Sequence, residues 1–203
     1  MKIKHVINSC FQSAKNKKIE AGSKRELHNE RSKAWVEYLT NSLRETFPNN
    51  ATIRIFSKHN DSNRKDFGVS ELLYDITVVR VASVESAFHK KNLLYFKESL
   101  WQVESEFARD SRQALIDFNK LVLGSAQNKL FIGPLVRDQA SFMKVLVPAA
   151  SVCSGNLFAA FIPHPSKWDN NLPGPRIGRF LLSFKIHYFR RRFFLATRGL
   201  TIC

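Results

Sequence analysis

Two glutamates in one short stretch have the spacing of a paired acidic site. In LWQVESEF, residues 100–107, Glu104 and Glu106 are separated by one residue, and Gln102 precedes them at the same spacing. Side chains two residues apart lie on the same face of an extended strand, so this pattern predicts a polar face opposite an apolar one. A solvated amphipathic strand is the ordinary alternative, since charged side chains mostly stay in water. The two interpretations differ in whether another charged group lies against this face.

Asp75 provides such a group. It lies inside LLYDITVVRVAS, residues 72–83, whose β-branched residues predict a buried strand. An unpaired carboxylate there would cost several kcal/mol, although a capped aspartate at a strand end is an alternative. If the two strands are neighbours, Asp75, Glu104 and Glu106 converge, and three carboxylates repel unless a cation lies between them. Oxygen ligands of this kind suit Mg²⁺ or Mn²⁺, which can activate water and stabilise charge on a phosphoryl oxygen.

The segments around these residues alternate between helical and extended patterns. Apolar residues recur at helical spacing over 26–47, and the helical pattern over 138–153 is disturbed by Pro148. The order predicts an α/β fold with a mixed central sheet flanked by helices on both faces. The expected strands are 51–56, 72–83, 100–107, 129–136 and 156–163, and the expected helices are 26–47, 109–124 and 138–153.

Composition predicts one main domain with basic extensions. Residues 1–25 are rich in lysine and are expected to form a loosely ordered arm, 26–165 form the domain, and 166–203 form a basic aromatic extension. From Pro175 to the end there are seven Lys or Arg, five Phe and no acidic residue. This segment is interpreted as a nucleic-acid-binding tail, a membrane-surface segment, or an irregular extension, as from a shifted reading frame.

The overall charge points to polyanionic partners. The formal net charge is +15 over 203 residues, which favours encounters with nucleic acids or anionic membranes. No run of 18 uncharged apolar residues exists, so no membrane span is expected. The three cysteines share no metal-ligand spacing, which favours a reducing compartment and a cytoplasmic location. The oligomeric state stays open, with a homodimer as one alternative.

These residues carry a family resemblance. A helix, a strand with Asp75, a strand with Glu104-x-Glu106, then a helix and a further strand resemble the PD-(D/E)XK nuclease superfamily, the restriction-endonuclease-like fold, over about residues 26–136. The resemblance implies a Mg²⁺-dependent endonuclease acting on DNA, with Asp75 and Glu104 as metal ligands. Glu106 stands where lysine is usual and is expected to act as a catalytic residue that helps to bind the ion or orients water. Tyr74 stands where the motif has proline. The missing lysine leaves an alternative, a catalytically inactive nucleic-acid-binding protein of the same fold.

Several residues are candidates for supporting roles. Glu30 lies on the expected inward side of the first helix, where the superfamily often uses a glutamate, although a carboxylate favoured by the helix dipole explains it as well. Glu71 precedes Asp75 on the same face, and Gln102 accompanies the glutamates. Three cations follow the acidic strand, and one of them is a candidate to offset phosphate charge in place of the missing lysine: Arg109, Arg112 and Lys120.

Basic loops are expected to contact the nucleic acid. Both loops that flank the Asp75 strand carry cations and are expected to border the cleft. Contacts of this kind would position a duplex through its phosphates without specifying a sequence. The expected nucleic-acid-binding residues are Lys58, Arg64 and Lys65 in the first loop, Lys90 and Lys91 in the second, and Arg112 after the acidic strand.

Overall fold

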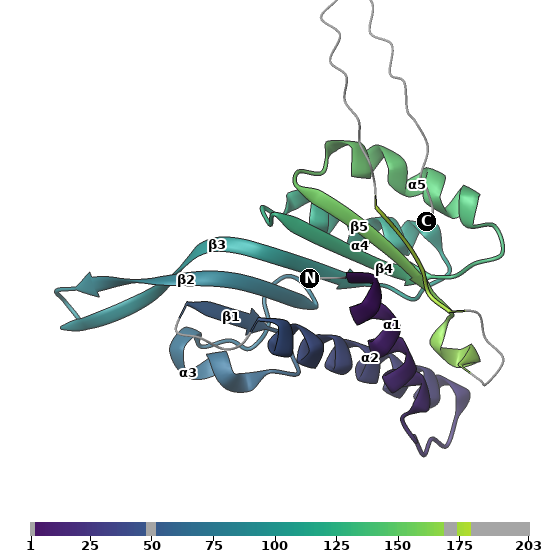
Figure 1. Ribbon diagram of the computed structural model, residues 1–203, viewed down its shortest axis with the longest axis horizontal. Coiled ribbons are helices and arrows are strands. Elements are labelled where there is room, and N and C mark those ends of the chain that lie inside the picture. Colours follow the sequence, from purple (N-terminus) through teal and green to yellow (C-terminus); the bar gives the residue numbers. More distant parts are fainter. Residues whose placement is uncertain (1–2, 48–51, 169–173, 180–203) are drawn as a thin grey trace, which may run out of the picture.

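An open six-stranded sheet organises the computed structural model, which describes residues 3–47, 52–168 and 174–179 (Figure 1). The strands lie in the order in which they occur in the sequence. Pairing is antiparallel except for β3 with β4 and β4 with β5, which are parallel. The predicted α/β class with a mixed sheet is confirmed. The strands are β1 (Ile53–Phe56), β2 (Ile76–Ser86), β3 (Lys91–Ser105), β4 (Asn128–Pro134), β5 (Asn156–Ile162) and β6 (Arg176–Arg179).

Helices cover both faces of this sheet. On one face lie α1 (Ile3–Asn16) and α2 (Lys24–Thr46), and on the other lie α4 (Ser111–Leu123) and α5 (Gln139–Val152). The parallel pairs require crossover connections, and α4 and α5 supply them. Within the described ranges, no helix has both the length and the apolar character needed to cross a bilayer. The short helices are η1 (Asp61–Asn63), α3 (Arg64–Phe67) and η2 (Pro165–Lys167).

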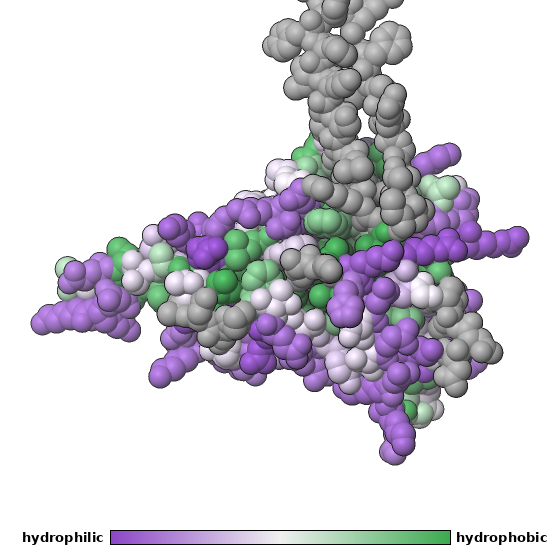
Figure 2. Space-filling model, in the orientation of Figure 1, coloured by the Kyte–Doolittle hydropathy of each residue, from purple (hydrophilic) through white to green (hydrophobic). Residues whose placement is uncertain are grey.

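The hairpin of β2 and β3 extends beyond the rest of the sheet. β1 pairs with β2 only as far as Arg80, and β4 pairs with β3 only over 101–105. β2 and β3 nevertheless continue as a pair to Ser86 and Lys91. We call residues 82–95 the β2–β3 arm. It projects at the left of Figure 1, and its tip is hydrophilic in Figure 2.

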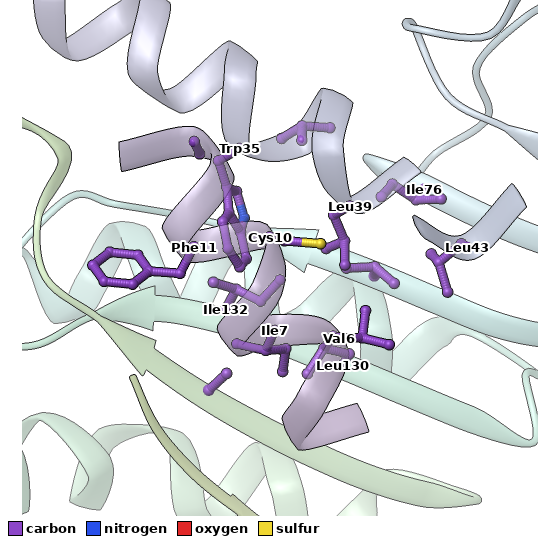
Figure 3. Packing of buried hydrophobic residues seen from close by; sticks show 14 of the residues in the cluster. Val6, Ile7, Cys10, Phe11, Trp35, Leu39, Leu43, Ile76, Leu130 and Ile132 are labelled. Atoms are coloured by element: carbon purple, nitrogen blue, oxygen red, sulfur yellow. The ribbon is translucent and has the colours of Figure 1, made fainter. Parts of the chain in front are cut away.

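The core beneath α1 and α2 is the larger of the two main apolar layers. Trp35 and Leu39 of α2 are almost completely buried and pack over Ile76, Leu130 and Ile132 of the sheet (Figure 3). The indole Nε1 of Trp35 also donates to Ser105 Oγ at 3.1 Å, at the end of β3. This contact fixes α2 against the strand end that precedes Glu106.

The expectation of a loosely ordered arm over residues 1–25 is wrong. Most of this segment is α1, whose apolar residues recur along one side of the helix and are buried against α2 and the sheet. Phe11 is only 1% exposed, and its ring contacts Trp168 edge-on with centroids 5.4 Å apart. The lysines that suggested disorder lie near the end of α1 and in the following loop. The buried residues are Val6, Ile7, Cys10, Phe11 and Ala14.

Other boundaries also differ from the sequence expectations. The strand expected over 72–83 begins only at Ile76, and α5 continues through Pro148 because Leu146 and Ala150 on either side are buried in the core. The extension expected over 166–203 begins within the domain, since Trp168 is buried and β6 pairs with β5. Residues 180–203, which include most of the basic aromatic segment, lie outside the described residues.

Truncating Phe11 tests whether α1 belongs to the core. Phe11→Ala should lower the free energy of unfolding by about 3–5 kcal/mol, because it removes a fully buried aromatic ring. Urea denaturation followed by tryptophan fluorescence measures this change. The control is Phe88→Ala, the same substitution at a ring that is 90% exposed, which should change stability by less than about 0.5 kcal/mol. Equal effects of the two substitutions would show that α1 adds nothing to the core.

Candidate active site

The pairing of β2 with β3 brings Asp75 to Glu104. Ile76 pairs with Val103 in antiparallel register, so Asp75, one residue before β2, lies level with Glu104. Asp75 Oδ2 accepts a hydrogen bond of 2.9 Å from the backbone N–H of Ser105. The expectation that these two strands are neighbours is therefore confirmed, although Asp75 precedes its strand instead of lying in the middle of it. Its carboxylate therefore points towards Ser105, the residue after Glu104.

Glu104 is a buried carboxylate with only one of its oxygens satisfied. Val103 faces the core beneath α2, so Glu104 faces the opposite side of the sheet, where α4 lies. Its side chain is 3% exposed. Oε2 lies 3.2 Å from Lys120 Nζ, whereas Oε1 is buried and accepts no hydrogen bond. A buried oxygen of this kind is costly and marks a position where a further donor or a cation would be stabilising.

The raised pKa values of Asp75 and Glu104 also indicate that the ionised forms of these carboxyl groups are poorly stabilised. Burial first, and then the neighbouring charge of Asp75, raise the pKa of Glu104 to about 8 in spite of Lys120. Burial also raises the pKa of Asp75, although the Ser105 N–H favours its ionised form. Two carboxylates that oppose each other's ionisation in a buried setting would both ionise readily if a cation were shared between them.

Lys120 is the cation that α4 brings to the acidic pair. Its Nζ lies 2.8 Å from Asp117 Oδ1 as well as 3.2 Å from Glu104 Oε2. Residues three apart lie on the same face of a helix, so Asp117 and Lys120 reach the site together. These carboxylates outweigh burial and raise the pKa of Lys120 above its usual value. Tyr74 holds the helix in place by donating from its hydroxyl to the Lys120 carbonyl at 3.1 Å.

Glu106 lies beyond the end of β3 and is linked to Asp117. Its backbone N–H donates to the Ile132 carbonyl at 2.9 Å, and its Oε1 accepts from the Ala108 N–H. Burial, followed by the hydrogen bond and charge of Asp117, raises the pKa of Glu106. Although burial opposes it, hydrogen bonds from Lys120 and Glu106 lower the pKa of Asp117. Of this pair, Asp117 is thus the carboxyl group that ionises more readily.

The supporting residues expected from the sequence have different positions. Gln102 accepts from the Ala126 N–H at 3.3 Å and joins β3 to the segment after α4, which is a structural role. Glu71 is exposed, and its charge contributes to the raised pKa of Asp75. Glu30 is on α2, whose buried side packs on the face of the sheet opposite Glu104, and it pairs with Lys33 at 2.6 Å.

The basic residues are divided between two distant regions. Lys58 is exposed, and its charge favours the ionised form of Asp75, so the first basic loop does border the site. In the same loop Lys65 is exposed, and Arg64 lies 3.8 Å from Asp61. Arg112 is exposed in the first turn of α4.

The second basic loop does not border the site, which corrects the expectation for Lys90 and Lys91. These residues lie at the turn end of the β2–β3 hairpin, whereas Glu104 lies at the other end of β3. The sequence analysis placed both loops beside the cleft because it expected β3 to begin near residue 100. The strand begins at Lys91, so its length carries the turn away from the site.

Asp117 is the site residue that the sequence analysis missed. The pattern Asp117-x-x-Lys120, on the helix directly after the acidic strand, was the available signal. Within the described part of the chain, no three His, Cys, Asp or Glu side chains are arranged as a group ready to hold a metal. The site offers two carboxylates, Asp75 and Glu104, beside a lysine. Mg²⁺ commonly binds one or two protein carboxylates and completes its coordination with water.

Comparisons with protein-family models, with curated proteins and with solved structures give no significant match.

Replacing Glu104 by Gln should reduce the pH dependence of stability. The folded-state pKa of about 8 is above the ordinary 4.5, so between these values the folded chain binds more protons than the unfolded chain. The contribution of Glu104 to stability is therefore present below about pH 4.5 and is lost as the pH rises to about 8, with a slope of at most about 1.4 kcal/mol per pH unit. Urea denaturation across this range measures the slope.

Glu104→Gln should flatten this slope without abolishing it, because Asp75 also has a raised pKa. Glu85→Gln, at an exposed position of the arm, is the control and should leave the slope unchanged. A Glu104→Gln variant with the same slope as the native chain would show that Glu104 ionises normally.

Proposed function

We propose that the protein is a divalent-metal-dependent phosphodiesterase that hydrolyses DNA. The observation that carries this proposal is the buried Glu104 carboxylate, which has one oxygen on Lys120 and the other without a hydrogen-bond partner, beside Asp75. Two carboxylates at the ends of neighbouring strands, with a lysine that reaches them from α4, fit the PD-(D/E)XK nucleases that the sequence resembles. It also gives the burial of these charges a functional reason.

Asp75 and Glu104 are the residues that would hold a Mg²⁺ or Mn²⁺ ion. The fit is supported by the unsatisfied Oε1 of Glu104, by the oxygen-only donor set, and by the raised pKa values of both carboxyl groups. When bound, such an ion supplies an activated water and stabilises charge on the phosphoryl oxygen. The carboxylates, for their part, fix the position of the ion relative to the strand ends.

Lys120 would take the role of the lysine that the motif usually places two residues after Glu104. It reaches Glu104 from α4 instead of β3, and its raised pKa keeps it charged at any physiological pH. A cation fixed by two carboxylates can donate to a phosphate oxygen without reorganising as charge develops there. The departure at Glu106 is thus compensated by a residue that is distant in the sequence.

Glu106 and Asp117 share a hydrogen bond beside this lysine. The contact raises the pKa of Glu106 and lowers the pKa of Asp117, so Asp117 is the more readily ionised of the two and would orient a water through its carboxylate oxygens. Asp75 and Glu104 are then free to act as ligands. This division of roles among four carboxyl groups is set by their environments.

The charge of the chain favours DNA as the polyanion that reaches this site. The exposed Lys58 lies close enough to favour ionisation of Asp75, and Lys65 is exposed in the same loop. Cations beside a phosphodiester-cleaving site would neutralise the phosphates next to the scissile one.

A catalytically inactive DNA-binding protein is the second candidate function. One observation favours it: Lys120 already neutralises one oxygen of Glu104 at 3.2 Å, so the site has a cation without any metal. Cleavage assays separate the two candidates, because the inactive protein would bind DNA and leave it intact.

Asp75→Asn should abolish metal-dependent cleavage while DNA binding remains. Supercoiled, linear and single-stranded DNA are incubated with the full chain and Mg²⁺, Mn²⁺ or EDTA. The native chain should cut with either metal ion, and Mg²⁺ should raise its Tm; the variant should show neither effect, since it lacks one of two ligand carboxylates. Asp61→Asn, at a side chain that is 72% exposed, is the matched control and should cut normally. Normal cutting by Asp75→Asn would reject this site.

Lys120→Met should lower kcat by about 10²–10³-fold with little change in KM, because the interaction is used chiefly in the transition state. Methionine keeps the aliphatic length of the side chain and removes its charge. Lys144→Met, at an exposed position of α5, is the control for the loss of one positive charge. If both variants lose activity equally, Lys120 contributes only to the general positive field.

A further inference from the structure

We propose that the β2–β3 arm binds duplex DNA through its tip, residues 86–91, well away from the cleavage site. This inference rests on the proposed action on DNA, and it names the substrate as a duplex that extends across the protein. The arm has no role in forming the candidate site, because Asp75 and Glu104 lie at the opposite ends of its strands.

The β2–β3 arm receives little stabilisation from the rest of the fold. Over residues 82–95 it consists of two strands, and in the described part of the chain no third strand or helix covers them to give the hairpin independent stability. Several of its apolar side chains remain exposed, among them Val84 at 53% and Tyr95 at 47%. A projecting two-stranded ribbon has, however, the dimensions that fit the major groove of B-DNA.

The tip carries the chemistry of nucleic-acid binding. The Phe88 ring is 90% exposed and lies next to His89, with ring centroids 4.9 Å apart. Lys90 and Lys91 follow and are exposed, and the segment from Ser86 to Lys91 contains no acidic residue. Figure 2 shows the hydrophilic side chains at this end of the arm. Cations that neutralise phosphates, together with a free aromatic ring that can stack on or wedge between bases, are complementary to DNA.

The backbone conformation at Lys90 indicates that this lysine is kept for its charge and not for the stability of the turn. Its φ is +50°, and it is the one non-glycine residue with positive φ among the described residues. Glycine or asparagine would fit this left-handed conformation with less strain. A lysine at this position therefore lowers the stability of the turn and adds positive charge beside Phe88 and Lys91.

The separation of the tip from the site sets the length of the proposed substrate. Lys90 and Glu104 are 14 residues apart along one extended segment, which corresponds to at most about 46 Å at about 3.3 Å per residue. This length equals about 14 base pairs of B-DNA. A duplex of about 14 base pairs is therefore long enough to contact the tip and the region of the site at once.

The experiment measures equilibrium binding of the full chain to a fluorescent 24-base-pair duplex, by anisotropy, in EDTA so that cleavage does not interfere. Phe88→Ala should weaken binding about tenfold, through the loss of base contact. Lys91→Ala should lower the slope of log affinity against log salt by about one. The controls are Leu123→Ala, at an 81% exposed apolar residue on α4, and Lys144→Ala on α5; both should bind as the native chain does.

Lys90→Gly distinguishes a binding role from a structural one. The substitution should leave Tm unchanged or raise it, because glycine relieves the positive φ, and it should still weaken binding several-fold. Shortening the duplex to about 8 base pairs should make the native chain and Phe88→Ala bind with more similar affinity, since so short a duplex cannot engage the tip and the site together.

The results also separate this inference from the proposed function. Arm variants that bind the duplex as tightly as the native chain would overturn the inference, whether or not the protein cuts DNA. The inference would also be overturned if Phe88→Ala bound DNA as the native chain does but lost self-association. The same holds if that variant lost binding to vesicles of anionic lipid while DNA binding was unchanged. Arm-dependent binding by a chain that never cuts would reject the nuclease and leave the inference standing.

Discussion

The register between β2 and β3 is the constraint on which the candidate site depends. It brings Asp75 level with Glu104 and lets the Ser105 N–H bond the Asp75 carboxylate. A shift of one residue would turn every side chain of one strand to the other face, so the register is specified by the apolar residues opposite the acidic ones. Ile76 and Val103 are almost completely buried under α2. The hydrophobic face of the sheet therefore positions the charges on its other face.

The crossover from β3 to β4 then decides which groups meet those charges. Because these strands are parallel, the chain must return along the sheet, and α4 does so on the face that carries Glu104. Asp117 and Lys120 arrive together on one side of that helix. Lys120 is thus held between Asp117 and Glu104, yet one oxygen of Glu104 stays unsatisfied. This residual cost is the strongest structural argument for a ligand.

The two ends of the β2–β3 hairpin have opposite physical characters. At the site, the strands are covered on both faces, Glu104 is buried, and Asp75 is partly buried. At the tip, the strands are uncovered and a phenylalanine is exposed among cations. Burial tunes proton affinities and fixes geometry, which suits chemistry, whereas exposure leaves charge and aromatic surface free for contact. The paired strands β2 and β3 join these two environments in one long hairpin.

The sequence by itself determined the α/β class and the alternation that separates Glu104 from the apolar face of β3, because both follow from local periodicity. The pairing of the Asp75 strand with the Glu104 strand was only a condition for the predicted site, and the structure meets it. The sequence also limited the cation that could replace the missing lysine of the motif to Arg109, Arg112 and Lys120.

Only the tertiary structure decided among these three cations, since helix packing against the sheet selects the side of α4 that faces Glu104. Only the tertiary structure likewise showed α1, because the lysines over 1–25 predicted a loosely ordered arm and obscured a buried apolar stripe, and only it revealed the environment of Lys129. That lysine is wholly buried, with Nζ donating to the Gly124 carbonyl at 2.6 Å, and no pattern in its neighbourhood signals such a partner. Long-range packing supplies the partners that make buried charges tolerable, and sequence periodicity contains no information about them.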